Sequence, residues 1–508
     1  MKFFTVAMPI WLRQKLWIKD LIRKELEYDG EIIFAEHHQS HAASAFFASP
    51  FEDAAILTID GVGEWTTTSY GYGSGNKITL THEIKFPHSL GLLYSAFTQY
   101  LGFKVNSGEY KVMGLAPYGK PVYYDLIMEN MIDLKDDGSF KLNMDYFAYT
   151  YAQQMINDKF VELFGHPPRE PEAKIEQHHC DIAMSIQRVT EEVMLRMVNH
   201  LYEETGQKNL CMAGGVALNS VANGRIIRET PFEEVFIQPT AGDAGGIGVA
   251  TFIWFNILGN KHDVAHKSNP NGIRTGPEKD LMQNSYLGPE YSNDEIKRFL
   301  DEKEVVYEEL GREELLKRTA EIIAGKRVVG WFQGRMEWGP RALGNRSILA
   351  DPRDKEMKDI VNLKVKFRES FRPFAPTVLL DKAAEYFELD RQSPYMLLVA
   401  QVREDKKRVI PAVTHVDGSA RVQTIAREDN PLYYDLIDAF YKITGVPVVL
   451  NTSFNVRGEP IVCTPEDAYT CFMRTKMDNL VMGNFMMRKE EQKQVEEDKD
   501  WREVFRLD

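Results

Sequence analysis

Two histidines one helical turn apart are the first residues in this sequence whose types and spacing suit metal chemistry. His37 and His41 lie in EHHQSHAASAFF, a predicted helix that Pro50 ends, so their rings share one helix face. Two imidazoles placed in this way can bind one metal ion. Histidines at this spacing also occur as ordinary helix residues, and His38, three residues before His41, leaves the choice of pair open.

Two aspartates favour the metal interpretation. Asp60 ends the apolar segment AAILTID, a predicted strand, and Asp243 opens a predicted helix directly after Gly242. Open α/β sheets build their sites at the carboxyl ends of strands and at helix starts. Two imidazoles with two carboxylates suit a divalent transition metal that keeps positions for substrate. The simpler alternatives are a turn residue for Asp60 and a helix N-cap for Asp243.

Two glycine-rich turns suggest an anion site. AGGVALNS (213–220) and AGDAGGIGVA (241–250) each follow a predicted strand and open a predicted helix. Glycine lets backbone N–H groups approach a phosphate, and a helix N-terminus favours the anion. One such turn is typically a tight connection, whereas two in succession indicate a nucleotide cradle in an actin-like sheet. A third irregular segment, GEYKVMGLAPYGKP (108–121), is either a ligand-contacting loop or structural filler.

Cations are concentrated in the second half of the chain, although the net charge is −14 (61 Lys and Arg against 75 Asp and Glu). They occur in WGPRALGNRSILADPR and KVKFRESFRPF, while Arg421 opens the strand RVQTI and LNTSFN ends another strand. These cations are either solvated or part of a site, and the aromatic residues between them would anchor the segments to a core. Because guanidinium groups bind phosphates bidentately, we predict a triphosphate or acyl-phosphate site.

The elements that must position these residues alternate between strand and helix, which predicts an α/β fold. EIIFAE (31–36) is predicted as a strand, TTTSYGYG and KITLTHEI as a meander, and 181–204 as the longest helix. The stretch 260–283 is polar, contains Pro and Gly, and is a candidate insertion or linker. At roughly 100–200 residues per domain, 508 residues predict two to four domains.

Composition excludes several classes. The acidic excess disfavours nonspecific binding to nucleic acid or anionic membranes. The sequence contains no run of about 18 apolar residues, so no membrane span is predicted. The first 26 residues lack the pattern of a signal peptide. They form a predicted basic amphipathic helix, which we expect to pack on the protein rather than on lipid. Four cysteines without a C-x-x-C pair indicate buried, reduced thiols and a cytoplasmic protein.

Taken together, these motifs resemble the O-carbamoyltransferases of antibiotic and nodulation-factor biosynthesis, the NodU/CmcH family. The resemblance rests on HHxxHAASA, TIDGVGE, MGLAPYG, AGGVALN, GDAGGxG, GRMEWGPRALGNRSILADPR, FRxxFRPFAP and LNTSFNxxGEPI, in this order, and runs from about Phe34 to about Phe485. It implies an N-terminal ASKHA (actin/RNase H-like) domain similar to TsaD, expected at 1–286, followed by a YrdC-like twisted open α/β domain, expected at 287–508.

The resemblance also implies a reaction. Carbamoyl phosphate and ATP, with Mg, would give carbamoyl-adenylate, and the carbamoyl group would pass to a hydroxyl of a small molecule. The implied metal, an iron(II)-type ion, would be held by His37, His41, Asp60 and Asp243. The implied adenylate site comprises Gly214, Gly215, Asn219, Gly245 and Gly246. The implied catalytic residues of the second domain are Arg341, Lys366, Arg368, Arg421, Ser453 and Asn455.

Family members usually begin with a strand–turn–strand carrying a D-x-S-A-type loop, and this sequence starts downstream of it. We therefore expect the first domain to lack about a hundred residues and one wall of its sites. The alternatives are a TsaD/YrdC-like tRNA-modifying enzyme, an ASKHA sugar kinase and a non-catalytic nucleotide-binding remnant. We expect no nucleic-acid or membrane partner, and a homodimer is the common oligomeric state for such a chain.

Overall fold

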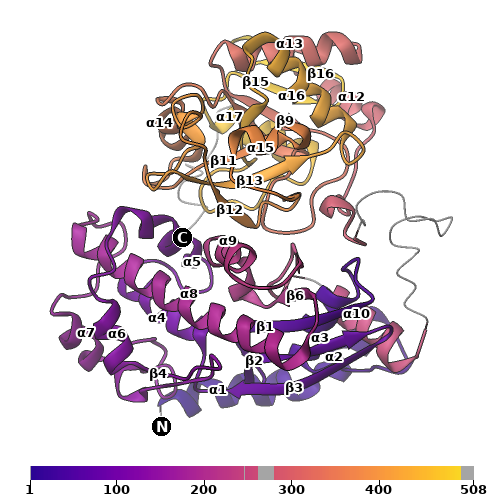
Figure 1. The fold of residues 1–508 in the computed structure, drawn as a ribbon. Coiled ribbons are helices and arrows are strands. Elements are labelled where there is room, and N and C mark those ends of the chain that lie inside the picture. The colour runs from indigo at the N-terminus through magenta and orange to yellow at the C-terminus, as the bar shows by residue number, and fades with distance from the viewer. Residues whose placement is uncertain (1, 245, 261–279, 494–508) are drawn as a thin grey trace. The chain divides into compact units, whose positions relative to one another are not determined.

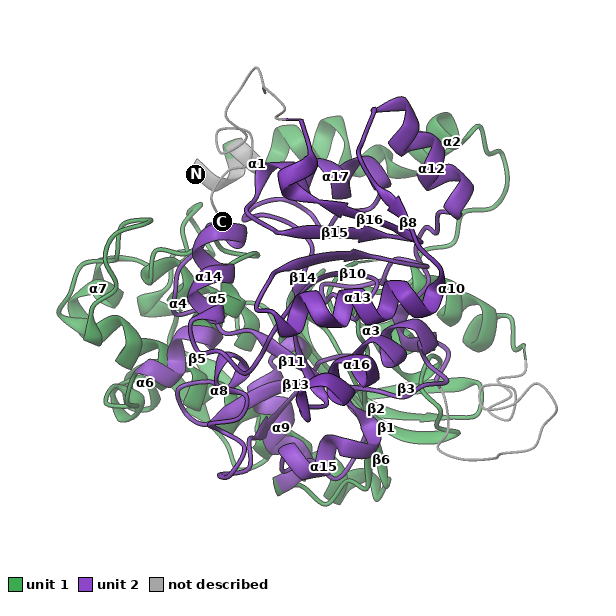
Figure 2. Ribbon diagram, turned by 90° about the horizontal axis from the view of Figure 1, so that it is seen from above, with its two compact units in different colours: residues 1–112, 119–217, 229–273 green, residues 113–118, 218–228, 274–508 purple. Residues whose placement is uncertain are grey.

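The computed structural model describes residues 2–244, 246–260 and 280–493, and its packing divides the chain into two compact units (Figures 1 and 2). Unit 1 contains residues 1–112, 119–217 and 229–273. Unit 2 contains residues 113–118, 218–228 and 274–508. Two short segments therefore pack with unit 2 although their neighbours in the chain pack with unit 1. Both units combine helices with β-sheets, which confirms the predicted α/β class. The predicted linker lies largely outside the described residues.

Unit 1 is built on a five-stranded sheet in the order β3-β2-β1-β6-β7. The first three strands form an antiparallel meander, and β6 and β7 run parallel to β1. A separate pair, β4 and β5, forms a small hairpin. The strands are β1 (Asp53–Gly63), β2 (Thr66–Ser74), β3 (Lys77–Lys85), β4 (Ile132–Leu134), β5 (Phe140–Leu142), β6 (Asn209–Ala213) and β7 (Glu234–Ile237).

The helices of this half of the chain cover the sheet because their apolar sides bury against it. Helix α3 packs against β1 and β6, and α4 and α8 also pack against β1. The predicted longest helix is confirmed as α8, 29 residues that end at Gly206. The helices are α1 (Lys2–Arg13), α2 (Ile18–Leu26), α3 (His37–Phe46), α4 (Leu90–Tyr100), α5 (Glu109–Leu115), α6 (Tyr124–Asn130), α7 (Asp158–Phe164), α8 (Gln177–Thr205), α9 (Ser220–Glu229) and α10 (Ile247–Thr251).

One prediction for the first 36 residues is wrong. EIIFAE is not a strand but an extended segment leading into α3, and Ile33 and Phe34 are exposed on it. A strand needs a ladder of hydrogen bonds, and no strand pairs with this segment among the described residues. Helix α2 buries none of its residues completely, and Trp17 before it is 54% exposed, while Leu21 and Ile22 are partly buried. The expected packing of this region on the protein therefore stays a prediction. Among the described helices, none has the length and apolar character needed to cross a membrane.

Unit 2 is built on a nine-stranded mixed sheet in the order β12-β13-β11-β14-β10-β9-β15-β16-β8. Its central strands β9, β10, β11 and β15 are buried along their whole length. The strands are β8 (Glu308–Glu309), β9 (Val329–Phe332), β10 (Arg346–Ala350), β11 (Ala375–Leu379), β12 (Leu398–Gln401), β13 (Ser419–Ile425), β14 (Val448–Ser453), β15 (Asn479–Met482) and β16 (Phe485–Arg488).

Capping side chains begin the main helices of this unit. The side chains of Ser292 and Thr464 form capping boxes for α12 and α17, and Asn430 caps α16 with Pro431 in the first turn. Helices α13 and α16 pack against each other, and α16 also packs on β11 and β14. The helices are α12 (Asn293–Glu302), α13 (Arg312–Ala324), α14 (Met357–Val361), α15 (Ala383–Tyr386), α16 (Pro431–Thr444) and α17 (Pro465–Arg474).

The two short segments of unit 2 make specific contacts with its main body. In α9, Asn223 Nδ2 donates to Leu397 O at 3.2 Å and Arg228 Nη1 donates to Val399 O at 3.1 Å. A Cβ on Gly224 would lie 2.2 Å from Val399 O, so this position has room only for glycine. In the segment 113–118, the Tyr118 hydroxyl donates to Phe371 O at 3.2 Å. Part of the irregular segment 108–121 therefore lies beside the FRPF loop.

Candidate metal centre and phosphate site

Helix α3 presents His37 and His41 on the side that faces the end of β1. Close packing holds the helix there, because a Cβ on Gly63 would lie 2.1 Å from the His37 ring and a Cβ on Gly248 would lie 2.1 Å from Ser40 O. His41 is buried, with a side chain 8% exposed, whereas the His37 side chain is 29% exposed. The predicted spacing thus places two imidazoles on one face.

Asp60 comes from the carboxyl-terminal part of β1. Parallel pairing of β1 with β6 places Asp60 beside the AGG turn, where the Gly215 N–H donates to Asp60 Oδ1 at 3.1 Å. The hydroxyl of Ser89, the N-cap of α4, donates to Gly61 O at 2.6 Å and to Asp60 O at 3.2 Å. The backbone carbonyl of Asp60 and its carboxylate Oδ1 are therefore both held by hydrogen bonds, and the second carboxylate oxygen, Oδ2, faces α3.

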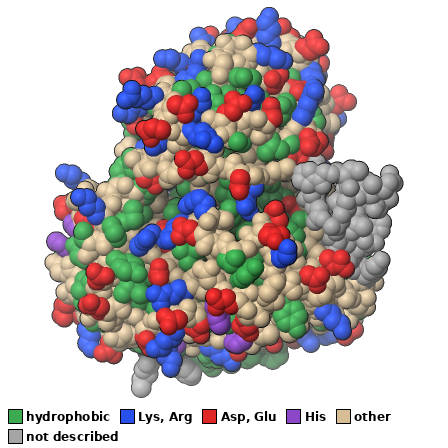
Figure 3. Space-filling model, viewed as in Figure 1, with side chains coloured by type: hydrophobic (Ala, Val, Ile, Leu, Met, Phe, Trp, Pro, Cys, Tyr) green, Lys and Arg blue, Asp and Glu red, His purple; other side chains and the backbone are tan. Residues whose placement is uncertain are grey.

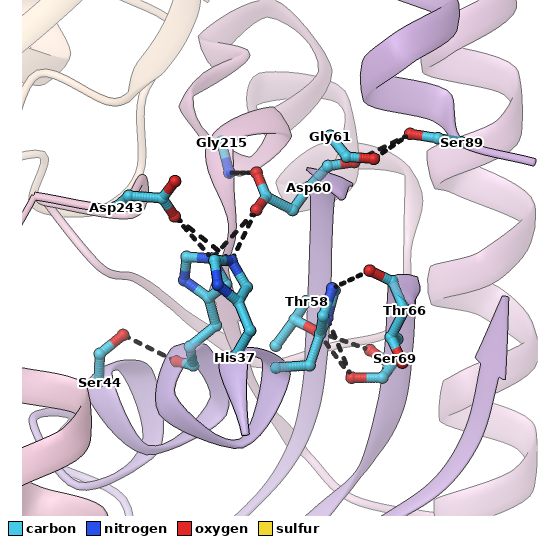
Figure 4. A network of polar contacts seen from close by, with 12 residues as sticks. His37, Ser44, Thr58, Asp60, Gly61, Thr66, Ser69, Ser89, Gly215 and Asp243 are labelled. Atoms are coloured by element: carbon cyan, nitrogen blue, oxygen red, sulfur yellow. Dashed lines mark hydrogen bonds and ion pairs between the residues drawn. The ribbon is translucent and has the colours of Figure 1, made fainter. Parts of the chain in front are cut away.

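The structure brings the two histidines and the two predicted aspartates together (Figure 4). Asp60 Oδ2 lies 2.9 Å from His37 Nε2 and 3.3 Å from His41 Nε2. Asp243 Oδ1 lies 3.3 Å and 3.4 Å from the same two nitrogens. One ligand atom from each residue lies within 4.8 Å of the other three. The Asp243 side chain is 72% exposed, so the cluster is open to solvent on that side.

These separations fit ligands around one cation. Donor atoms about 2.1 Å from a shared ion lie about 3.0 Å apart at right angles and about 3.4 Å apart in a tetrahedron. The measured separations between nitrogen and oxygen span 2.9 to 3.4 Å. Two imidazoles, which are neutral when they bind a metal, and two carboxylates also offer the charge and donor types that suit a divalent transition metal. The residues present therefore fit the predicted ion.

The charges in this cluster depend on one another. Burial opposes protonation of His41, but hydrogen bonds to Asp243 and Asp60 outweigh it and raise the pKa of His41 to about 9. Burial likewise opposes ionisation of Asp60, yet hydrogen bonds from His37 and His41 hold the pKa of Asp60 well below its usual range. The hydrogen bond with His41 also lowers the pKa of Asp243. Both carboxylates are thus ionised and available to a cation.

His38, the competing histidine in the sequence, points elsewhere. Its Nδ1 lies 2.6 Å from Thr58 Oγ1 and its Nε2 lies 3.0 Å from Thr66 O. Burial lowers the pKa of His38 to about 4, so the ring is neutral at pH 7. His38 therefore connects α3 to β1 and β2, and the pair at the cluster is His37 with His41.

The glycine turns support this cluster by close packing against β1 and by a hydrogen bond to Asp60. Gly214 adopts φ +91° and a Cβ there would lie 2.2 Å from Ile59 O, so close packing against β1 requires glycine. Gly215 supplies the N–H to Asp60, and Gly246 is the N-cap residue of α10. Asn219 Oδ1 accepts from Ala222 N at the start of α9, and Asn219 belongs to unit 2. Gly245 lies outside the described residues.

The second predicted group is centred on Lys366, which is 2% exposed at the end of the helical segment Asn362–Lys366. Its Nζ donates to Ser453 O at 2.7 Å and to Asn455 O at 2.8 Å, and it also contacts Ser453 Oγ and Asn455 Oδ1 at 3.2 and 2.5 Å. Burial lowers the pKa of Lys366 well below its usual range, and Arg368 adds to the effect. Three of the predicted residues thus form one polar cluster where β14 ends.

The predicted arginines gather in the same unit. Burial, with the charges of Arg341, Arg368 and Arg372, lowers the pKa of Arg421 well below its usual range. Arg368 lies over the Phe374 ring at 4.7 Å, and its Nε donates to Asn362 Oδ1 at 2.8 Å. Arg372 Nη1 also lies 3.7 Å from Glu369 Oε2. Guanidinium groups gathered in this way suit an anionic ligand. Arg372 lies in the cationic segment KVKFRESFRPF but is not among the predicted catalytic residues.

Two other arginines of the cationic segments are structural. Arg346 is fully buried, donates to the carbonyls of Gln333, Gly334 and Asn345, and stacks on Phe332 at 3.7 Å. Arg353 pairs with Asp351, its Nη2 lying 2.6 Å from Oδ2. Their side chains satisfy buried carbonyls and a buried carboxylate, so these two positions do not contribute to an anion site.

Comparison with known proteins gives the family. The family model "Carbamoyltransferase N-terminus" matches residues 2–251, and "Carbamoyltransferase C-terminus" matches residues 320–489. An uncharacterized Synechocystis protein is 54% identical over all of this chain and 86% of its own length. Nodulation protein NolNO of Sinorhizobium fredii is 41% identical over 95% of this chain and 68% of its own length.

A relative with a named activity is also similar along most of its length. The 3'-hydroxymethylcephem-O-carbamoyltransferase of Amycolatopsis lactamdurans is 32% identical, with 88% of this chain and 79% of that protein covered. The two family models together span both units, and the predicted resemblance is thereby confirmed. This chain belongs to the carbamoyltransferase family and is an enzyme of that class.

Proposed function

We propose that this enzyme is an O-carbamoyltransferase that forms carbamoyl-adenylate from carbamoyl phosphate and ATP, and then transfers the carbamoyl group to a hydroxyl of a small molecule in the cytoplasm. Residues 287–508, as a YrdC-like domain, carry out the first step. Residues 1–286, as an ASKHA domain, carry out the second. The observation that carries the proposal is the convergence of His37, His41, Asp60 and Asp243 within 4.8 Å, in a chain that also holds a separate cationic site.

In the first step, the cationic site binds phosphate charge. The guanidinium groups of Arg341, Arg368 and Arg421 neutralise the phosphates of both substrates, while Lys366 holds the end of β14 and the Ser453 and Asn455 side chains in register. Water hydrolyses carbamoyl phosphate to carbamate and inorganic phosphate. A carbamate oxygen then attacks the α-phosphorus of ATP, and pyrophosphate leaves. Catalysis of this kind comes mainly from positioning and electrostatics.

In the second step, the protein positions the carbamoyl donor and the acceptor hydroxyl. His37, His41, Asp60 and Asp243 would hold a divalent metal, iron(II) in type, which would supply Lewis acidity toward the carbamoyl oxygen when bound. The Gly215 N–H and Ser89 fix Asp60, so one carboxylate oxygen stays directed at the cluster. The exposed side at Asp243 gives the acceptor access. AMP is the second product.

Replacement of a proposed ligand tests the division of labour. His41→Ala should abolish carbamoyl transfer but leave carbamoyl-phosphate-dependent exchange of pyrophosphate into ATP near the wild-type rate. His82→Ala is the matched control, because His82 is exposed on β3 and not part of the cluster. The reaction is supplied with ATP, carbamoyl phosphate and iron(II), with and without a panel of sugars and aminoglycosides. Loss of both activities in His41→Ala, with the fold intact, would overturn the proposal.

The same assays separate the alternative functions. A sugar kinase would release ADP rather than AMP and pyrophosphate. A binding remnant would bind nucleotide without turnover. A tRNA-modifying enzyme would shift total tRNA in a gel. The surface disfavours tRNA binding, because acidic and basic side chains are intermixed on the described part of the face in Figure 3.

A further inference from the structure

A pocket of about 280 Å³ lies at one edge of the nine-stranded sheet, where the parallel strands β9 and β15 end. Open α/β sheets bind ligands at the carboxyl ends of such strands. The residues after β9, the turn after β15 and the start of α12 line the pocket, together with the rings of Tyr291 and Phe332. Pockets for drug-sized ligands have volumes of roughly 300–1,000 Å³, so this one suits a single ring system.

One carboxamide in the pocket has a fixed orientation. Gln333 Nε2 donates to Gly483 O at 3.0 Å. A carbonyl oxygen only accepts, so the amide cannot be reversed, and Oε1 is the end that remains. Gln333 Oε1 has no hydrogen-bond partner among the described residues and is not enclosed by protein atoms. Gln333 therefore presents an open acceptor to a ligand in the pocket.

A second carboxamide presents a donor. Asn293 Oδ1 accepts from Asn484 N at 3.2 Å, which again fixes the amide, and Asn293 Nδ2 makes no hydrogen bond within the described part of the chain. Gly483 adopts φ +52°, and a Cβ there would lie 2.3 Å from Asn293 Oδ1, so the close approach requires glycine. Gln333 and Asn293 are thus both anchored on the turn between β15 and β16, one with its acceptor free and the other with its donor free.

Strand register places this pocket near the predicted phosphate site. Ser347 of β10 pairs with Trp331 of β9 on one side and with Ser453 of β14 on the other. Neighbouring strands lie about 4.8 Å apart, so Trp331 and Ser453 are about 10 Å apart across the sheet. Gln333 follows Trp331 by two residues, and Ser453 contacts the Lys366 ammonium group. The ribose and first phosphate of a nucleotide can span such a separation.

We propose that this pocket binds the adenine of ATP, with Gln333 Oε1 accepting from the exocyclic amino group and Asn293 Nδ2 donating to the adjacent ring nitrogen. The proposal rests on the proposed function, which brings the triphosphate to the cationic site. Asparagine and glutamine amides recognise adenine by the same paired contacts in nucleic acids. The Tyr291 ring adds an aromatic surface for the base. A purine without the amino group would leave the Gln333 acceptor unpaired and should bind more weakly.

Two substitutions separate the acceptor from the donor. Gln333→Leu removes the acceptor. Asn293→Asp keeps the oxygen that accepts from Asn484 N and removes the Nδ2 donor. Gln401→Leu is the matched control, because Gln401 is exposed on β12 at the opposite edge of the same sheet. Thermal unfolding confirms that the variants are folded.

The probes are ATP and purine riboside triphosphate, which carries hydrogen in place of the amino group. Equilibrium dialysis measures Kd for each nucleotide, and carbamoyl-phosphate-dependent exchange of pyrophosphate measures KM. Loss of one neutral hydrogen bond should raise Kd and KM for ATP about two- to tenfold in Gln333→Leu, while purine riboside triphosphate stays within about twofold. Asn293→Asp should weaken both nucleotides, because they share the ring nitrogen. KM for carbamoyl phosphate should not change in either variant.

Equal weakening of the two nucleotides in Gln333→Leu would overturn the proposal, because it indicates a structural role for the amide. Unchanged ATP binding in both variants would overturn it as well. Absence of exchange in the wild-type enzyme would refute the proposed function. Dialysis needs no turnover, so in that case it would still test whether the pocket binds adenine.

Discussion

Asp60→Asn should weaken metal binding at the cluster with little change in the shape of the protein. The carboxylate contacts His37, His41 and the Gly215 N–H, and the asparagine amide keeps the size but loses the charge. Residues that merely hydrogen-bond to a metal ligand cost about 10–100-fold in affinity when replaced, so removal of a charged ligand should cost at least about 100-fold. At a metal concentration of about 100 Kd, the wild-type protein gains about 2.7 kcal/mol of stability, whereas the variant should gain only about 0.4 kcal/mol.

Chemical unfolding with and without iron(II) under anaerobic conditions measures this difference directly. Asp53→Asn is the matched control, since Asp53 is the exposed first residue of the same strand and lies outside the cluster. Its stabilisation by metal should equal that of the wild-type protein. A metal response in Asp60→Asn as large as in the control would show that Asp60 is not a ligand. A loss of stability in the metal-free variant alone would point to an ion pair with His41.

Three further outcomes follow from close packing and burial. Gly248→Ala should destabilise the protein by about 1–3 kcal/mol in thermal unfolding, because the new Cβ meets Ser40 O, and it should also weaken the metal response. Arg346→Met should cost about 3 kcal/mol or more, measured by urea unfolding, since it leaves buried carbonyls unpaired, and a surviving folded fraction should keep its KM for ATP. Burial lowers the pKa of His179 to about 4, so the unfolded state binds more protons between about pH 4 and 6.5 and stability falls as the pH drops through this window. His179→Gln should flatten that slope in unfolding curves taken across the window, and an unchanged slope would contradict the assignment.

The sequence predicted which four side chains meet in the first cluster, for physical reasons that particular residues illustrate. His37 and His41 required only the helical repeat, and Asp60 and Asp243 required only the rule that sites form where strands end and helices begin. The choice between His37 and His38 as the partner of His41 needed the tertiary structure, because it depends on Thr58 and Thr66 in two strands of the meander. The strand prediction for the segment 31–36 was wrong, because its apolar pattern predicts a strand but no partner strand is found among the described residues.

The second site was predictable as a region rather than residue by residue. The density of cations in the sequence does not distinguish Arg346 and Arg353 from Arg341. Tertiary contacts are needed to show that the first two satisfy buried carbonyls and a carboxylate.

The contacts of α9 with Leu397 and Val399 determine where this chain can be cut into fragments. Strand β12 is the outermost strand of the nine-stranded sheet. Asn223 donates to the carbonyl of Leu397, just before this strand, and Arg228 donates to the carbonyl of Val399 within it. A fragment that begins at residue 274 would leave these carbonyls exposed, ready to pair with another molecule. Such a fragment should self-associate, whereas one that retains residues 218–228 in a permuted or co-expressed form should stay monodisperse.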